Sequence, residues 1–311
     1  MSPDPLSLDE WIVTSRPPRN PLPADRPYAY MVEPECAADG RLVDVATLFL
    51  TNKECPFRCL MCDLWKNTLA ESVAPGQIPE QIRWALAQLP PAQHIKLYNA
   101  GSFFDRKAIP VADYTEIARL VAGFERVIVE CHPKLVGRSC WEFRDLLAGE
   151  FEVAMGLETA HPEVLRRLNK SMTLEDFAQA ARNLQRERIA SRAFIIVRPP
   201  YLSDAEGVEW ACRSLDFAFS VGVGCCCLIP TRGGNGVMEE LARQGEFAPP
   251  SLDAMERAMD YGLSLKAGRV FIDLWDIEKV SPDAPDRAAR IARLARMNLS
   301  QKLEPAVRGE S

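Results

Sequence analysis

CPFRCLMC (residues 55–62) carries three cysteines, Cys55, Cys59 and Cys62, at spacings of four and three residues. The apolar run 46–50 precedes it, so the cysteines stand on a loop that follows a predicted strand. Because this loop is rich in proline, arginine and lysine, three unligated core cysteines are disfavoured. Three thiolates on one short loop can instead hold three corners of an iron–sulfur cluster and leave one iron open to another ligand.

A zinc site is the alternative that these cysteines leave open. Structural zinc sites are normally closed by a fourth protein ligand, whereas catalytic ones keep a position free. The nearest other candidates are Cys36 and His94, and neither stands at a local ligand spacing. An iron–sulfur cluster with one open iron therefore fits the sequence better than zinc does.

The CxxxCxxC spacing after a strand resembles the signature of the radical S-adenosylmethionine (SAM) superfamily. The resemblance implies that Cys55, Cys59 and Cys62 hold a [4Fe–4S] cluster, and that SAM bound at its open iron is cleaved reductively to a 5′-deoxyadenosyl radical. It also implies an external one-electron reductant of the flavodoxin or ferredoxin type. Met61 stands where the family usually has an aromatic residue, and its polarisable side chain can still cover the cluster or an adenine edge.

The composition of the whole chain is typical of one cytoplasmic domain. Its 311 residues are 47% hydrophobic, enough for one large core. No stretch approaches the roughly 18 apolar residues that span a bilayer, and no secretion signal is present, so we expect no membrane contact. Ten cysteines in such a chain are expected to be reduced. The net charge of −6 argues against a generally basic nucleic-acid binder but leaves room for a local basic patch.

Apolar runs alternate with helical patterns over residues 42–275, which favours parallel strands joined by crossover helices. We predict an α/β fold, a partial (β/α)6 TIM-like barrel of the radical SAM type with one extra strand. The expected strands are 43–51, 94–99, 127–131, 152–157, 192–197, 224–229 and 269–274. The expected helices are 79–89, 111–122, 141–147, 162–168, 174–186, 205–219 and 252–265.

Two flanking segments lie outside this predicted barrel. Residues 1–41 hold 8 of the 24 prolines and show no periodicity, so we expect an irregular arm. Residues 276–311 are expected to form a basic helix and tail, with the cations Arg287, Arg290, Arg293, Arg296, Lys302 and Arg308. A solvated or acid-paired helix face is one interpretation of these cations, and a nucleic-acid contact is the other.

Functional groups of such barrels gather at the carboxyl ends of the strands. The second predicted strand is followed by Asn99, Gly101 and Ser102. In the radical SAM family this position carries a small-residue motif that hydrogen-bonds the SAM amino group. The usual Gly-Gly-Glu is absent here, so the resemblance implies SAM binding by these three residues, with a plain turn as the alternative.

The next two strands end in the carboxylates Glu130 and Glu158. A glutamate in an otherwise apolar strand is costly unless it is paired or bound to a ligand. The resemblance implies that such groups bind SAM, which makes Glu158 and, second, Glu130 candidate ligands. The alternative for each is a buried ion pair with Arg198 or Lys170.

Three residues at strand ends are candidates for catalysis, namely Glu130, His132 and Arg198. His132 has the chemistry to carry a proton to the substrate, although a lone histidine after a strand is also a common structural cap. Arg198 is placed to meet a carboxylate bidentately.

Five short stretches resemble one branch of the radical SAM superfamily: 62–65 (CDLW), 101–103 (GSF), 156–159 (GLET), 168–170 (LNK) and 198–201 (RPPY). They are similar to proteins related to the archaeosine-biosynthesis lyase subunit and, more distantly, to the elongator catalytic subunit. The resemblance implies a lyase or transferase that modifies a nucleoside in tRNA, with a partner subunit. A small metabolite is the second substrate hypothesis. A non-catalytic iron–sulfur protein is the third, although such a barrel has no reason to keep polar groups at its strand ends.

Overall fold

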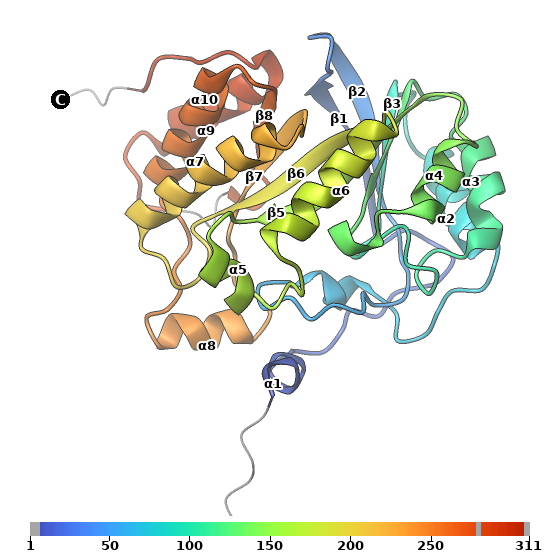
Figure 1. The fold of residues 1–311 in the computed structure, drawn as a ribbon, viewed down its shortest axis with the longest axis horizontal. Helices are drawn as coiled ribbons and strands as arrows, with labels where there is room; N and C mark the ends of the chain where they lie inside the picture. Colours follow the sequence, from blue (N-terminus) through green and yellow to red (C-terminus); the bar gives the residue numbers. More distant parts are fainter. Residues whose placement is uncertain (1–6, 278–280, 308–311) are drawn as a thin grey trace, which may run out of the picture.

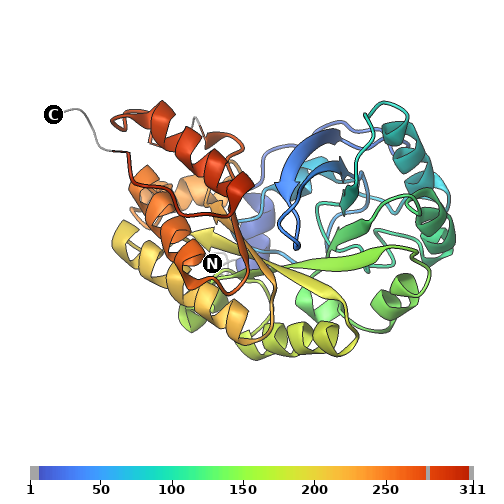
Figure 2. The same ribbon diagram turned by 90° about the horizontal axis from the view of Figure 1, so that it is seen from above.

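The computed structural model describes residues 7–277 and 281–307, and its centre is one eight-stranded sheet in the order β1 to β8. The strands are β1 (Ala29–Cys36), β2 (Leu42–Phe49), β3 (His94–Tyr98), β4 (Arg126–Glu130), β5 (Glu150–Glu158), β6 (Ala190–Val197), β7 (Cys225–Pro230) and β8 (Arg269–Ile272). Only the β1–β2 pair of this sheet is antiparallel; the other six ladders are parallel. The sheet curls into an open half barrel (Figure 2).

Helices cover the outer face of the sheet and one end of the barrel (Figure 1). The outer helices are α2 (Gln77–Leu86), α3 (Tyr114–Leu120), α4 (Arg138–Arg144), α6 (Leu174–Arg186), α7 (Asp204–Ser220) and α9 (Leu252–Leu265). At the carboxyl ends of the strands lie α1 (Leu8–Thr14), α5 (Pro162–Arg167) and α8 (Val237–Arg243), and α10 (Arg287–Ser300) contacts both β1 and β8. Short 3-10 turns occupy Leu64–Asn67, Val111–Asp113 and Pro133–Leu135. None of the described helices is long and apolar enough to cross a bilayer.

All seven strands predicted from the sequence are present, with ends shifted by at most two residues. The helices α6 and α9 have the predicted bounds, and Ser203 caps α7 in a capping box with Glu206. Three elements were not predicted. Residues 8–14 were assigned to an irregular arm but form α1, which Ser7 caps in a capping box with Glu10. Residues 29–36 were assigned to an irregular arm but form β1, where Pro34 and two glutamates interrupt the apolar pattern; an antiparallel edge strand tolerates them. The short helix α8 was not recognised, because it directly follows a glycine-rich loop.

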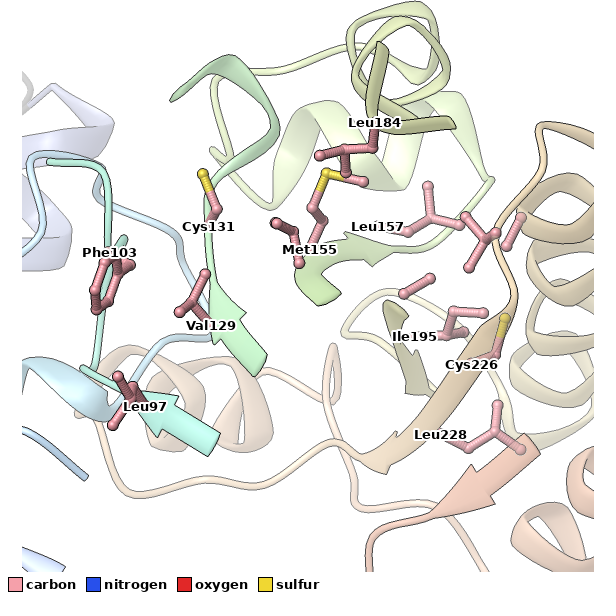
Figure 3. Packing of buried hydrophobic residues seen from close by; sticks show 14 of the residues in the cluster. Leu97, Phe103, Val129, Cys131, Met155, Leu157, Leu184, Ile195, Cys226 and Leu228 are labelled. Atoms are coloured by element: carbon pink, nitrogen blue, oxygen red, sulfur yellow. The ribbon is translucent and has the colours of Figure 1, made fainter. Parts of the chain in front are cut away.

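Side chains alternate between the two faces of the sheet. Leu97, Val129, Ile195 and Leu228 point outward and pack in the main core under the helices (Figure 3). Cys226 is part of this core, whereas its neighbours Cys225 and Cys227 lie with Phe271 on the inner face. The inner face of the sheet therefore holds a separate set of side chains.

The inner face is polar near the amino ends of the strands. The carboxylate of Glu152 is fully buried and accepts hydrogen bonds from Arg126 (2.8 Å), Arg192 (2.7 Å) and Arg269 (3.3 Å). Arg192 also binds Glu35 at 2.6 Å, and Lys96 pairs with the same carboxylate. We call these residues of β1, β3, β4, β5, β6 and β8 the ion layer: Glu35, Lys96, Arg126, Glu152, Arg192 and Arg269.

In the ion layer, the attraction between opposite charges offsets the free energy that is needed to remove these charges from water. Burial raises the pKa of the Glu152 carboxyl, but the charges of its three arginines more than offset this and lower the pKa to about 2. Arg269 on β8 also donates to the carbonyl oxygen of Cys36 on β1 at 3.1 Å. The ion layer therefore bridges the two edge strands, which no backbone ladder joins.

We expect Glu152→Gln to lower the free energy of unfolding at pH 7 by about 3–5 kcal/mol, because it leaves buried guanidinium groups without their counter-charge. Glu150→Gln is the matched control: the Glu150 side chain is 69% exposed and also pairs with Arg126. A loss below about 1 kcal/mol is expected for it. Urea unfolding followed by circular dichroism measures both variants.

The pH dependence gives a second readout. A carboxyl with a lowered folded-state pKa contributes stability that is complete above its unfolded pKa of about 4.3 and is lost as the pH falls toward about 2. The stability difference between wild type and Glu152→Gln is therefore expected to shrink between about pH 5 and pH 2. A difference that stays constant over this range contradicts the ionic role of Glu152.

Candidate functional site

The loop after β2 brings Cys55, Cys59 and Cys62 to the carboxyl end of the sheet as free, partly exposed cysteines. A turn in which the Cys62 amide donates to the Cys59 carbonyl oxygen at 3.2 Å sets their spacing. Burial raises the pKa of Cys59 to about 11 and the pKa of Cys55 and Cys62 to about 12, and the three thiols influence one another electrostatically. The three thiols therefore lie near one another.

The three thiols are a donor set that a four-iron cluster can use. Such a cluster binds each thiolate through a different iron, so its cysteines do not have to converge on one point. Among residues 7–277 and 281–307, no three His, Cys, Asp or Glu side chains surround one ion position.

The cysteine loop is fastened from outside by the segment that follows α1. Glu54, next to the first cysteine, pairs with Arg16 at 2.7 Å, with Arg58 at 2.9 Å and with Arg19. The Arg16 guanidinium also lies over the Trp65 ring, 4.7 Å from its centroid. The sequence carried no local signal for the contacts of Arg16 and Arg19, because these two arginines are 38 and 35 residues from Glu54.

The loop after β3 touches the cysteine loop. A Cβ atom on Gly101 would lie 3.3 Å from the Cβ of Cys55, so the two backbones approach closely. Asn99 is fully buried, and neither its amide nitrogen nor its amide oxygen has a hydrogen-bond partner in the part of the chain that the structure describes. An orphaned buried amide costs free energy unless a ligand binds it. The residues predicted here therefore include one polar group that is free to bind.

Ser102 and Glu130 have internal partners instead. The Ser102 hydroxyl accepts the amide N–H of His132 at 3.3 Å and lies 3.4 Å from the Cys131 sulfur. One carboxylate oxygen of Glu130 accepts the amide N–H groups of Asn99 (2.6 Å) and Gly101 (3.4 Å), and burial raises the pKa of this carboxyl. Both side chains hold the loop after β3 in place.

His132 has the geometry of a structural cap. Its Nδ1 accepts the amide N–H of Lys134 at 3.2 Å, so Nε2 carries the proton and donates to the Lys170 carbonyl oxygen at 2.9 Å. The ring stacks on Phe57 with centroids 3.6 Å apart. Burial lowers the pKa of His132 to about 4, which keeps the ring neutral at pH 7. With both nitrogens engaged, the cap interpretation is favoured over proton transfer.

Glu158 forms a buried ion pair with Lys170, with Oε1 and Nζ 2.5 Å apart. A side chain at Gly156 would collide with both groups, so this position requires glycine. Despite burial, the charges of Glu158 and of the Cys59 thiolate raise the pKa of Lys170. The structure thus contains the ion-pair alternative for Glu158, beside the cysteine loop.

Arg198 and Met61 occupy different surroundings. Arg198 has φ 53° and donates from Nη1 to the Pro249 carbonyl oxygen at 2.8 Å, with Asp204 at 3.5 Å. It therefore contacts the loop after α8, and its predicted carboxylate partner among substrates stays a prediction. Met61 packs against Leu168 and neighbouring apolar residues, and its predicted contact with a cluster or an adenine also stays a prediction.

Three arginines of α10 are engaged in ion pairs. Their partners are Asp253 and Glu256 for Arg290, Asp260 for Arg293 and Glu304 for Arg296. Arg293 is almost fully buried. These arginines fasten α10 to α9 and to the segment after α10, as the acid-paired interpretation predicted. Arg308, a further member of the predicted basic patch, lies outside the described residues.

The buried pair predicts a stability effect for Glu158. We expect Glu158→Gln to lower the free energy of unfolding by about 3–5 kcal/mol, because Lys170 is left charged and buried. Glu163→Gln, which breaks an exposed pair with Arg166, is expected to cost less than about 1 kcal/mol. Chemical unfolding of both variants is the measurement, and equal stabilities would contradict a structural role for the pair.

The chain resembles known proteins in sequence over its central part. The family model of the radical SAM superfamily matches residues 50–210. The archaeosine synthase subunit beta of Methanosarcina acetivorans is 26% identical over 208 residues, which cover 62% of this chain and 58% of that protein. The protein of the same name from Thermococcus kodakarensis is 28% identical over 127 residues, 39% of each chain. The chain therefore matches less than two thirds of the length of these relatives.

Solved structures share the fold. Elp3 of the archaeon Methanocaldococcus infernus superposes with a TM-score of 0.50 at 15% identity, over 66% of this chain and 53% of that one. SuiB of Streptococcus suis superposes with a TM-score of 0.53 at 12% identity, over 78% and 51%. At such identities the likeness concerns the half barrel alone. Because the family model spans more than half of its length, the chain belongs to the radical SAM superfamily of enzymes.

Proposed function

We propose that Cys55, Cys59 and Cys62 hold a [4Fe–4S] cluster at which SAM binds. The observation that carries the proposal is the placement of three partly exposed thiols on a loop that touches the loop of Asn99, whose buried amide has no partner in the described chain. When bound, the cluster supplies the electron that cleaves SAM to the 5′-deoxyadenosyl radical. An external reductant of the flavodoxin or ferredoxin type provides that electron.

Some side chains near the cysteine loop are proposed to bind SAM, and others hold the loops of the site in place. The Asn99 amide has donors and an acceptor for the amino-acid part of SAM, and neither its nitrogen nor its oxygen has a partner in the described chain. Lys170 places a positive charge near Cys55 and Cys59, which offsets the negative charge of thiolates. Glu130 holds the loop that carries Asn99. A non-catalytic binder is disfavoured, because orphaned buried groups cost free energy when no ligand uses them.

A nucleoside in tRNA is the proposed substrate, and a small metabolite is the alternative. Two similar proteins carry the name archaeosine synthase subunit beta, which supports tRNA and a partner subunit. The loop after β3, next to the cysteine loop, also presents two exposed cations, Arg106 and Lys107. Neither has an ion-pair partner among the described residues. Polyanions such as tRNA are attracted by such groups.

The cluster assignment is tested by iron content. We expect Cys59→Ala, reconstituted without oxygen, to lose the brown chromophore and most bound iron, since one corner of the cluster has no ligand. Cys212→Ala is the matched control, because Cys212 is a half-buried cysteine of α7 outside the loop, and it should keep both. Four irons per chain in Cys59→Ala would contradict the assignment of Cys59 as a cluster ligand.

The tRNA hypothesis is tested by salt dependence. We expect the double variant Arg106→Ala/Lys107→Ala to bind tRNA more weakly and to reduce the slope of log affinity against log salt by about two, one unit for each lost phosphate contact. Filter binding across a salt series measures the slope.

The double variant Arg188→Ala/Lys266→Ala is the control for that experiment. It removes the same charge from exposed residues just before β6 and β8, at the opposite end of the sheet, and should leave the slope unchanged. Undetectable tRNA binding by the wild-type chain at low salt would favour the small metabolite instead.

A further inference from the structure

Five aromatic side chains form a continuous row along the inner side of the sheet. The ring centroids of Phe49 lie 5.5 Å from Tyr28, 6.1 Å from Tyr98 and 5.3 Å from Trp275, and Tyr98 lies 6.0 Å from Phe194. Leu97 and Ile195 point toward the helices (Figure 3), so their neighbours Tyr98 and Phe194 point to the inner face. We call these five residues the aromatic row.

The aromatic row differs from the other large aromatic cluster of the protein. That second cluster lies between sheet and helices, and each member is at most 6% exposed: Phe103, Phe104, Tyr114, Phe143 and Phe151. In the aromatic row, Trp275 is 42% exposed, and Phe49, Tyr98 and Phe194 are only half-buried. Core packing accounts for the second cluster, whereas the aromatic row keeps part of its apolar surface in contact with solvent.

Polar groups border the aromatic row beside Trp275. Asp273 and Arg232 form an ion pair at 2.9 Å, and both side chains keep access to solvent. The Trp275 amide donates to Asp273 at 2.8 Å, and Arg232 donates to the Trp275 carbonyl oxygen. A carboxylate and a guanidinium therefore hold the backbone of Trp275 on both sides of its side chain.

The aromatic row lies at the ends of the strands that lead into the cysteine loop and the loop after β3. Phe49 is the last residue of β2, Tyr98 is the last residue of β3, and the Tyr28 amide donates to the Phe49 carbonyl oxygen at 2.9 Å. The two following loops meet where a Cβ on Gly101 would lie 3.3 Å from the Cβ of Cys55. A ligand on the row would therefore lie at the strand ends that carry the cysteines. An aliphatic ligand would bury the same apolar surface but would gain nothing from stacked rings.

We propose that the aromatic row binds a planar heteroaromatic ring of the substrate, stacked on Trp275, with Asp273 and Arg232 at the hydrogen-bonding edge of the ring. Nucleobases combine such a flat π face with a polar edge. This inference rests on the proposed function, since it assigns the ring of the substrate on which the radical formed at the cysteine loop acts.

The test uses the reconstituted holoprotein with saturating SAM, so that the nucleoside site of SAM is filled, and guanosine as the probe. Saturation-transfer NMR should show stronger saturation of the guanine ring proton than of the ribose protons. Trp275→Leu should weaken guanosine binding about tenfold, the size of one lost base–aromatic stack. Trp275→Phe keeps a stacking surface and should restore most of the affinity.

Trp210→Leu is the matched control, because Trp210 is a half-buried tryptophan of α7 that stacks on His161 (4.3 Å) away from the row. Its guanosine affinity should equal that of wild type. Absent guanosine binding in the wild type, or unchanged affinity in Trp275→Leu, overturns the inference. If that wild-type chain still cleaves SAM, the proposed function stands without the aromatic site. Guanosine binding by a chain that never cleaves SAM supports the site and removes the proposed function.

Discussion

The carboxylate of Glu152, buried against three arginines, is the constraint on which the rest of the half barrel depends. Strands β1 and β8 share no backbone ladder, and the ion layer supplies contacts across that opening. Such a layer is stable only while every charge keeps its partner, because a single unpaired buried ion is costly. With the amino ends of the strands fixed in this way, the carboxyl ends can carry long loops and half-buried side chains.

Polar groups at the carboxyl ends fall into two kinds. Glu130, Ser102 and His132 form hydrogen bonds with backbone atoms of neighbouring loops, and their predicted roles toward SAM or substrate stay predictions. The Asn99 amide is buried and unpaired in the described chain, which is the condition expected of a group that binds a ligand. The cysteine loop touches the loop after β3 and is held in place by the ion pairs of Glu54 with Arg16 and Arg58.

The features that were predicted correctly are those whose signal lies within a short stretch of the sequence. The cysteine motif lies within eight residues, and α6 and α9 have periodic apolar faces and a capping residue, so these were predicted with their bounds. The partner of Glu158 was left open between Lys170, which follows α5, and Arg198, which follows β6, because only tertiary packing decides between them. The aromatic row joins residues from Tyr28 to Trp275, and no local pattern relates them. The strand β1 was not predicted, because Pro34 interrupts its apolar pattern.

We propose that this half barrel uses a cluster on Cys55, Cys59 and Cys62 to cleave SAM by one-electron reduction. This reaction releases 5′-deoxyadenosine, which liquid chromatography and mass spectrometry quantify after incubation of SAM with the anaerobically reconstituted chain and dithionite. We expect 5′-deoxyadenosine that requires chain, SAM and reductant together and exceeds one equivalent per chain over time. Intact SAM after prolonged incubation of a chain that carries four irons would contradict it.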